Sequence, residues 1–304
     1  MLRVLNVSKS GFYAWLKRLV SPRATRNAVL LEEIKAVHNV SRGSYGSPRV
    51  TAALRRSGSR VSKHRVARLM RTAELRGKSH RKSRVSTTNS KHSQPRSANL
   101  LERDFKASEP DQKWLSDITY LSTTEGWLYL AVVLDVFSRR VIGWAFSSSL
   151  ESNLVVSAFD MACQSRKPSD GLVFHSDQGV QYASAEFRAA LSRLEVVQSM
   201  SRRGDCWDNS PCERPKPVSD PARKVHGLDQ EGAAVRVKKS FFSTLKLELD
   251  LRKSRGTKLE TQALVFEWME VFYNRQRLHS SLNFLSPAEF EQSGLRLLES
   301  TKQG

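Results

Sequence analysis

The clearest pattern in the chain is a series of apolar runs that begins near residue 109. Three consecutive runs are rich in β-branched and aromatic residues, with the turn-like segments "STTEG" and "FSR" between them: "KWLSDITYL", "GWLYLAVVLDV" and "RVIGWAFSS". Two helical stretches, about Asn153–Gln164 and Ala183–Leu194, alternate with two short strands, "GLVFHSD" and "EVVQSM". This order predicts an α/β domain with flanking helices, whose mixed five-stranded sheet begins with three antiparallel strands.

The N-terminal third has helical periodicity instead. Residues 1–20 predict a partial helix-turn-helix with Val7 and Ser8 at the turn, and residues 24–39 predict a longer helix. Two further helical runs, about Pro48–Arg56 and Ser62–Thr72, flank a Gly/Ser turn. They predict a second helix-turn-helix, so the core is preceded by an all-α region.

Charge separates the same two parts. Residues 1–108 contain 25 lysines and arginines against 5 acidic residues, whereas residues 109–304 contain 25 of each, so the net charge of +20 lies in the first third. The second helix-turn-helix is basic, while Val66, Leu69 and Met70 fall on the opposite face of its last helix. This favours double-stranded DNA as a partner over a helical pair with a merely solvated face. The candidate DNA contacts are Arg55, Arg56, Lys63, Arg65, Arg68 and Arg71.

Composition also limits the compartment. The longest apolar run is interrupted by Asp135 and is too short to span a membrane. No signal-peptide pattern occurs, and three cysteines lack the spacing of a disulfide framework, which predicts a cytoplasmic protein. The predicted parts are a partial helix-turn-helix (1–20), a helical DNA-binding region (21–85), a basic linker (86–108), the α/β core (109–290) and a C-terminal tail (291–304).

Three acidic residues are candidates for chemistry. Asp117 lies within the first strand of the core, Asp177 follows the fourth, and Glu213 comes 36 positions later at a helix start. Ligands of open α/β sheets bind at strand ends, and carboxylates suit hard cations such as Mg²⁺ or Mn²⁺. Two such ions about 4 Å apart would support phosphoryl transfer. On spacing alone, the alternative is that all three are ordinary surface acids.

Several long motifs resemble one family. The segments "DITYLSTTEGWLYLAVVLDVFSRRVIGWAFS", "VFHSDQGVQYAS", "SMSRRGDCWDNSPCE", "SFFSTLKLEL" and "VFYNRQRLHSSLNFLSPAEF" resemble the integrase core of OrfB-type DDE transposases of the bacterial insertion-sequence-3 family. The N-terminal segments "GFYAWLKR" and "YGSPRVTAALR" resemble the DNA-binding region of those proteins.

The resemblance implies an RNase H-like core in which Asp117, Asp177 and Glu213 are the catalytic and metal-binding DDE triad. It implies cleavage at element ends and strand transfer with two Mg²⁺ or Mn²⁺ ions and no nucleotide cofactor. It also implies a homo-oligomer on DNA, localisation to the bacterial nucleoid, and an upstream OrfA partner or a frameshift fusion to it.

Other candidates have structural alternatives. Arg275 and Arg277, in "YNRQRLHSSL", are candidate DNA contacts or helix-capping residues. Asp135 is predicted to pair with Arg139 or Arg140 rather than to bind metal.

The triad is interrupted beyond Glu213. Deleting the 26 residues 214–239, "RPKPVSDPARKVHGLDQEGAAVRVKK", would restore the continuous segment "DNSPCESFFSTLKLEL" of the family. Either the helix resumes near Ser240 after a loop, or one helix starting near Asp229 carries Lys239 where Glu213 belongs. Because an isolated helical turn is not self-supporting, the insertion predicts weak or absent catalysis. The alternative function is a catalytically impaired remnant that only binds element-end DNA.

Overall fold

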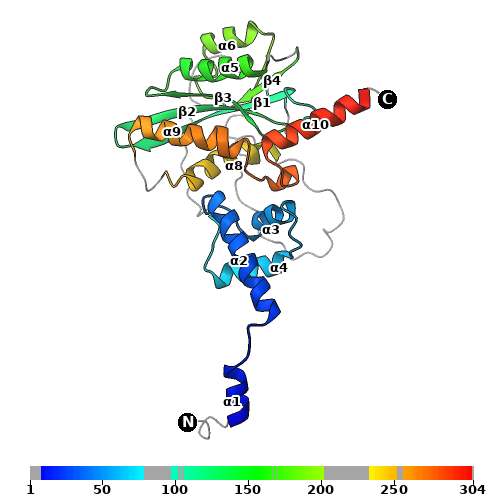
Figure 1. Ribbon diagram of the computed structural model, residues 1–304. Coiled ribbons are helices and arrows are strands. Elements are labelled where there is room, and N and C mark those ends of the chain that lie inside the picture. Colours follow the sequence, from blue (N-terminus) through cyan, green and yellow to red (C-terminus); the bar gives the residue numbers. More distant parts are fainter. Residues whose placement is uncertain are drawn as a thin grey trace, which may run out of the picture. The chain divides into compact units, whose positions relative to one another are not determined.

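The computed structural model describes residues 8–78, 97–101, 104, 106–166, 168, 170–201, 233–251 and 256–302. They belong to two compact units, Met1–Lys78 and Ser79–Gly304. Figure 1 labels helices and strands of both units where there is room.

The first unit is helical. It contains α1 (Lys9–Leu16), α2 (Pro22–Val40), α3 (Ser47–Arg56) and α4 (Lys63–Thr72). Serine side chains at positions 8, 21 and 62 accept backbone hydrogen bonds and cap the starts of α1, α2 and α4. The predicted second helix-turn-helix is thus present as α3 and α4. Of the predicted first turn, Ser8 caps α1, whereas Val7 lies outside the described residues.

A small apolar core holds α2, α3 and α4 together. Their inward faces bury Ile34, Val50, Leu54, Val66 and Met70. The spacing of these residues leaves the basic positions outward, as the periodicity predicts. In contrast, α1 contains no buried residue.

The second unit is built on the predicted five-stranded mixed sheet. Its strands are β1 (Lys113–Thr123), β2 (Gly126–Asp135), β3 (Val141–Ser147), β4 (Val173–Ser176) and β5 (Val197–Met200), in the order β3-β2-β1-β4-β5. β1, β2 and β3 are antiparallel, and β4 and β5 join in parallel beyond β1. The predicted fold class is confirmed.

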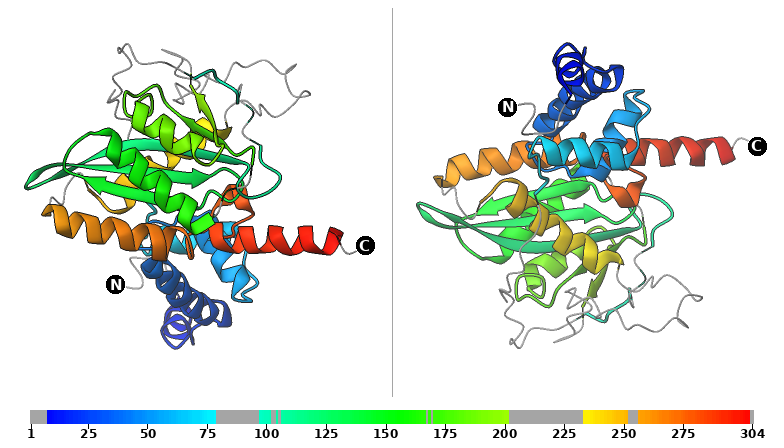
Figure 2. Two further views of the ribbon diagram at one scale, coloured as in Figure 1. Left: turned by 90° about the horizontal axis from the view of Figure 1, so that it is seen from above. Right: turned by 90° about the horizontal axis from the view of Figure 1, so that it is seen from below.

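Helices cover both faces of this sheet. α5 (Ser152–Arg166) and α6 (Ala185–Ser192) lie on one face, and α8 (Ala233–Glu248) lies on the other (Figure 2). The α5 and α6 face holds a cluster of rings in which Phe159 meets Phe174 edge-on at 5.4 Å and 89°. Such a ring pair contributes about 0.5–1.5 kcal/mol beyond the burial of its area.

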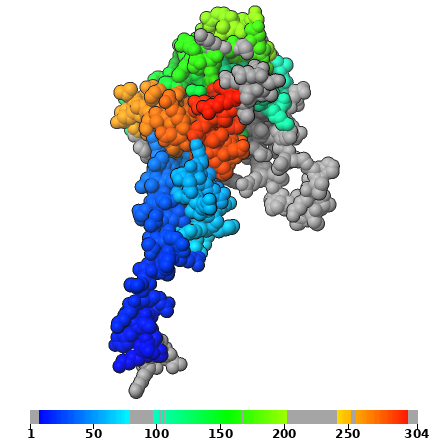
Figure 3. All heavy atoms as spheres, turned by 45° about the vertical axis from the view of Figure 1, so that its right-hand side comes forward, coloured from blue at the N-terminus to red at the C-terminus, as the bar shows by residue number. Residues whose placement is uncertain are grey.

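The C-terminal helices extend the core past its predicted boundary. α9 (Lys258–Glu267) continues into a π-helical turn (Trp268–Tyr273), and a 3₁₀ turn (Ser280–Leu282) precedes α10 (Pro287–Lys302). α9 and α10 are the orange and red helices on the surface of this unit in Figure 3. Glu291 of α10 is 4% exposed and binds both terminal nitrogens of Arg166 on α5. The predicted tail therefore begins inside a packed helix.

The end of the predicted linker also belongs to the core. The amide nitrogen of Met200 donates to the carbonyl of Ala98, and the amide nitrogen of Leu100 donates to Ser199 Oγ. Leu101 is 3% exposed. Residues 97–101 thus run beside β5, which composition alone did not indicate.

Within the described ranges, no helix is long and apolar enough to cross a membrane.

Gly143→Ala is expected to destabilise the second unit. β3 passes α5 so closely that an added Cβ would lie 2.2 Å from the Ala158 carbonyl oxygen and 2.8 Å from the Ala162 nitrogen. These backbone atoms cannot rotate away, so the free energy of unfolding should fall by at least the about 1–3 kcal/mol typical of overpacked cores. Urea denaturation measures this loss.

Gly171→Ala is the matched control. Its added Cβ would meet no atom within 4 Å, but φ is +83°. The left-handed backbone should therefore cost about 1–2 kcal/mol without crowding. A loss at Gly143 smaller than that at Gly171 would contradict the close contact between β3 and α5.

Candidate active site

Two acidic residues come together at the centre of the sheet. β1 and β4 pair in parallel, with Leu115 opposite His175. Continuing this register by two residues sets Asp117 beside Asp177, which directly follows the last residue of β4. Neighbouring strands lie about 4.8 Å apart. Two positions separated by 60 residues of sequence are therefore neighbours in the fold.

Asp117 lies on the face of the sheet that α8 covers. Trp114 belongs to the cluster under α5 and α6, and strand alternation therefore points Leu115 and Asp117 the other way. α8 packs against β1, and its Phe241 and Leu245 side chains are buried. The candidate site thus lies where α8 meets the central strand.

Local hydrogen bonds orient each carboxylate. Asp177 is 8% exposed, and its Oδ1 accepts a hydrogen bond from the amide nitrogen of Gly179 at 3.0 Å. A Cβ at Gly179 would lie only 3.0 Å from that same oxygen, so glycine leaves room for the carboxylate. Asp117 is partly buried, and its Oδ1 accepts from the amide nitrogen of Ile118 at 2.9 Å.

Besides burial, the charges of the two carboxylates raise the pKa of the same two tyrosines, Tyr182 and Tyr120. The Tyr182 hydroxyl lies 2.8 Å from Ser116 Oγ. Burial raises the pKa of Tyr182 well above its ordinary value, and the charges of Asp117 and Asp177 raise it further. Burial, and then the charges of nearby groups that include both aspartates, also raise the pKa of Tyr120. Both phenols therefore stay protonated, and the site has a negative potential that favours cations.

The third predicted carboxylate, Glu213, lies outside the described residues. The helix behind it is described: α8 begins at Ala233, within the predicted insertion, and runs through Lys239 without a break. Of the two predicted arrangements, the backbone matches the one in which the helix extends into the insertion. Its predicted start near Asp229 is outside the described residues.

The donor set fits a hard divalent cation in part. Carboxylate oxygens are the ligands that Mg²⁺ and Mn²⁺ take, and such oxygens are carried by Asp117 on β1 and by Asp177, which directly follows β4. Within the described ranges, no group of three or more His, Cys, Asp or Glu side chains could hold a metal ion.

The carboxylate of Asp135 has other partners than the predicted arginines. Its carboxylate accepts hydrogen bonds from the amide and hydroxyl of Ser138, at 2.9 and 2.8 Å, and from the amide of Asp111. Arg140 pairs instead with Glu291. The predicted pairing of Asp135 with Arg139 or Arg140 is therefore wrong, because the turn folds its own hydroxyl onto the carboxylate.

Comparisons with known proteins show which proteins this chain resembles. Models of an integrase core domain match residues 107–206 and 239–295, and a model of an HTH-like domain matches residues 25–83. The "transposase InsF for insertion sequence IS3A" of Escherichia coli is 39% identical over 298 residues, which are 97% of this chain and 94% of that protein. The chain belongs to the insertion-sequence-3 family of transposases.

A second relative of this chain is the "insertion element IS600 uncharacterized 31 kDa protein" of Shigella sonnei. It is 36% identical over 292 residues, 96% of this chain and 97% of that protein. Neither integrase match includes residues 207–238, which contain all but the last residue of the predicted insertion. Among solved structures, the HTLV-2 integrase catalytic core domain in complex with magnesium is 16% identical and aligns with a TM-score of 0.41 over 61% of this chain and 99% of that chain.

A buried ion pair anchors the C-terminal end of α8 in this transposase-family core. Arg277 is 4% exposed, and its Nε and Nη2 donate to Glu248 Oε1 at 3.1 and 2.9 Å. Trp268 Nε1 donates to the other carboxylate oxygen at 3.1 Å. The guanidinium thus faces the protein interior, which argues against the predicted DNA contact at Arg277. Arg275 is exposed.

Sequence reasoning missed Glu248, because nothing in "LKLELD" distinguishes this acid from its neighbours.

His175 is buried on β4, and its Nδ1 lies 3.0 Å from Ser199 Oγ. Its contact lies within the sheet, two residues before Asp177.

The predicted DNA contacts of the first unit differ in their surroundings. Five of them are exposed: Arg55, Arg56, Lys63, Arg68 and Arg71. Arg65 is partly buried and donates from Nε and Nη2 to Asn27 Oδ1, at 3.0 and 2.8 Å. These bonds fix the plane of its guanidinium.

Arg277→Met is expected to lower the free energy of unfolding of the second unit by about 3–5 kcal/mol, because it leaves the buried charge of Glu248 without its cation. Urea denaturation of the full chain measures the change. The double variant Arg277→Met, Glu248→Gln should recover much of the loss. Equal losses in the single and double variants would contradict a direct pair.

Proposed function

We propose that the chain is a DNA transposase that binds the ends of an insertion element, cleaves there and transfers the strands to a target. One observation supports this most: the parallel β1–β4 pairing, continued two residues beyond Leu115 and His175, brings Asp117 next to Asp177. Family membership favours this function over that of a remnant that only binds element-end DNA.

The proposed metal ligands are Asp117, Asp177 and Glu213, with Mg²⁺ or Mn²⁺ as the cofactor and two ions in the site. Bound divalent ions activate an attacking oxygen and stabilise the leaving oxygen in phosphoryl transfer. The protein contributes position. The amide of Gly179 orients Asp177, the amide of Ile118 orients Asp117, and the sheet fixes their separation.

The proposed partner is double-stranded DNA, element end and target, held through the basic first unit. A homo-oligomer follows from the chemistry, because joining two ends requires that both be held at once. We also propose a cytoplasmic location at the nucleoid and assembly with an upstream OrfA protein or a fusion to it.

Asp117→Asn and Asp177→Asn are expected to abolish strand transfer, measured with element-end DNA and Mg²⁺ in a version lacking residues 214–239. The loss should exceed the about 10–100-fold that follows removal of groups that only support metal ligands. Affinity for end DNA, measured without metal, should be unchanged.

Asp160→Asn is the matched control for this experiment. Asp160 lies on α5 with a side chain 46% exposed, 3.9 Å from Arg193. The same chemical change there should leave strand transfer intact. Retention of activity in Asp177→Asn would refute the assignment of the site.

The insertion bears on activity rather than on the class of protein. Deleting residues 214–239 joins Glu213 to Ser240, so that Glu213 takes the helix position of Lys239. In the intact chain that position is cationic. We therefore expect the shortened version to transfer strands at least about 100-fold faster than the intact chain, as metal sites tolerate little misplacement.

Lys239→Glu in the intact chain tests the same idea without deletion. It should raise strand transfer and Mg²⁺ affinity. Lys238→Glu makes the same charge change about 100° around the helix and should not. Strand transfer by the intact chain as strong as that of the shortened version would overturn the inferred effect of the insertion, while leaving the transposase assignment in place.

A further inference from the structure

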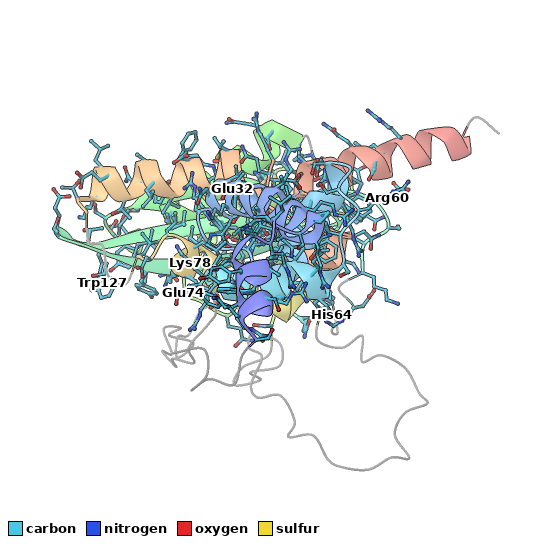
Figure 4. All side chains as sticks on the ribbon, turned by 60° about the horizontal axis from the view of Figure 1, so that its bottom comes forward. Glu32, Arg60, His64, Glu74, Lys78 and Trp127 are labelled. Atoms are coloured by element: carbon cyan, nitrogen blue, oxygen red, sulfur yellow. The ribbon has the colours of Figure 1, made fainter. Side chains whose placement is uncertain are left out.

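The first unit contains a basic hollow of about 490 Å³ between α2 and α4. α2 contributes two arginines to it, and α4 contributes two more, together with a histidine and the serine that caps the start of α4. The lining residues are Arg23, Arg26, Ser62, His64, Arg65 and Arg68. Figure 4 labels His64 in the first turn of α4, and Arg60 at a different edge of the same unit.

No acid of the described chain balances these charges. None of the four lining arginines forms an ion pair with an acidic residue in the described ranges. The acids of α2 are engaged elsewhere, since Glu32 pairs with Lys35 and Glu33 accepts from the Ser59 hydroxyl. Asn27 holds Arg65 but is neutral. The hollow therefore concentrates positive charge that an external anion would offset.

The helix ends add to this field. α2 and α4 both start at the hollow, capped by Ser21 and Ser62, and neither has an acidic residue in its first turn. Helix N-termini carry partial positive charge and normally favour acids. Arg23 and Arg65, in the first turns of these helices, therefore work against helix stability, which is the pattern of an anion site rather than of a solvated face.

Arginine also suits the geometry of a phosphate. The planar fork of the Arg65 guanidinium is held by two hydrogen bonds to Asn27, so it is oriented before any ligand arrives. A guanidinium binds two phosphate oxygens at once, which an ammonium cannot do. Arg55 and Arg56, on α3, do not line the hollow.

We propose that this hollow is a clamp for a backbone phosphate of double-stranded DNA. It fixes how the unit sits on the duplex and does not read sequence, since phosphate contacts position a protein and base contacts specify the site. The proposal rests on the proposed DNA binding of the chain. It assigns phosphate contacts to Arg23 and Arg26, outside the helix-turn-helix that the sequence pattern identified.

The test uses the full chain and two duplexes of equal length and unrelated sequence, with affinity measured by fluorescence anisotropy over a range of KCl concentrations. Arg26→Gln and Arg68→Gln should weaken binding to both duplexes by the same factor. Each should also reduce the slope of log affinity against log salt by about 0.9 for each phosphate that the variant no longer neutralises. Lys35→Gln, on α2 but paired with Glu32, is the matched control and should change neither.

Inorganic phosphate separates a clamp from general charge. At equal ionic strength, phosphate should displace DNA from the wild-type chain more strongly than chloride, and this difference should shrink in the arginine variants. A circular dichroism spectrum like that of the wild type shows that each variant is folded. Arg26→Lys, which keeps the charge but loses the fork, should have an intermediate effect.

The outcomes are distinct. A wild-type chain that binds neither duplex contradicts the proposed function itself. If the wild-type chain binds both duplexes and the folded Arg26→Gln and Arg68→Gln variants bind them with the same affinity, the clamp alone is overturned. An effect confined to one duplex also overturns it, because the hollow would then read bases.

Discussion

The site depends on one strand covered on both faces. β1 points Trp114 into the rings under α5 and α6, and points Asp117 toward α8. A shift of one residue would drive the carboxylate into the aromatic cluster and expel the tryptophan, and burying an unpaired charge among apolar side chains is prohibitive. The aromatic packing, far larger than any contact of the site itself, therefore fixes which way the acid faces.

Parallel pairing then converts this orientation into a site. β4 can lie beside β1 only after α5 has crossed the sheet, so the neighbours Asp117 and Asp177 come from distant segments. Asp177 sits just past the strand end, where Gly179 leaves space and donates a hydrogen bond. Two carboxylates held this way repel each other in the absence of a cation, and the hydrogen-bonded scaffold keeps them together.

Local sequence patterns predicted the helices and strands. The features that they did not predict depend on contacts between residues far apart in the sequence. Runs rich in β-branched and aromatic residues indicated β1 to β3, and the basic amphipathic runs indicated α3 and α4. The continuation of the core through Glu291 requires Arg166, and the burial of Arg277 requires Glu248, each far away in sequence. For Asp135, sequence proximity to two arginines misled, because Ser138 is placed by the turn to hydrogen-bond first.

α8 shows why the insertion matters in physical terms. Its C-terminal half is fixed by the burial of Phe241 and Leu245 and by the ion pair of Glu248. Once that half is formed, adding helical residues at its N-terminus is favourable, since propagation needs no new nucleus. The preceding "AAVRVKK" contains alanine, arginine and lysine, which are good helix formers, so the helix extends into the insertion. The packing of α8 therefore fixes a helix position for the proposed third ligand, while the residues inserted before Ser240 decide which residue occupies that position.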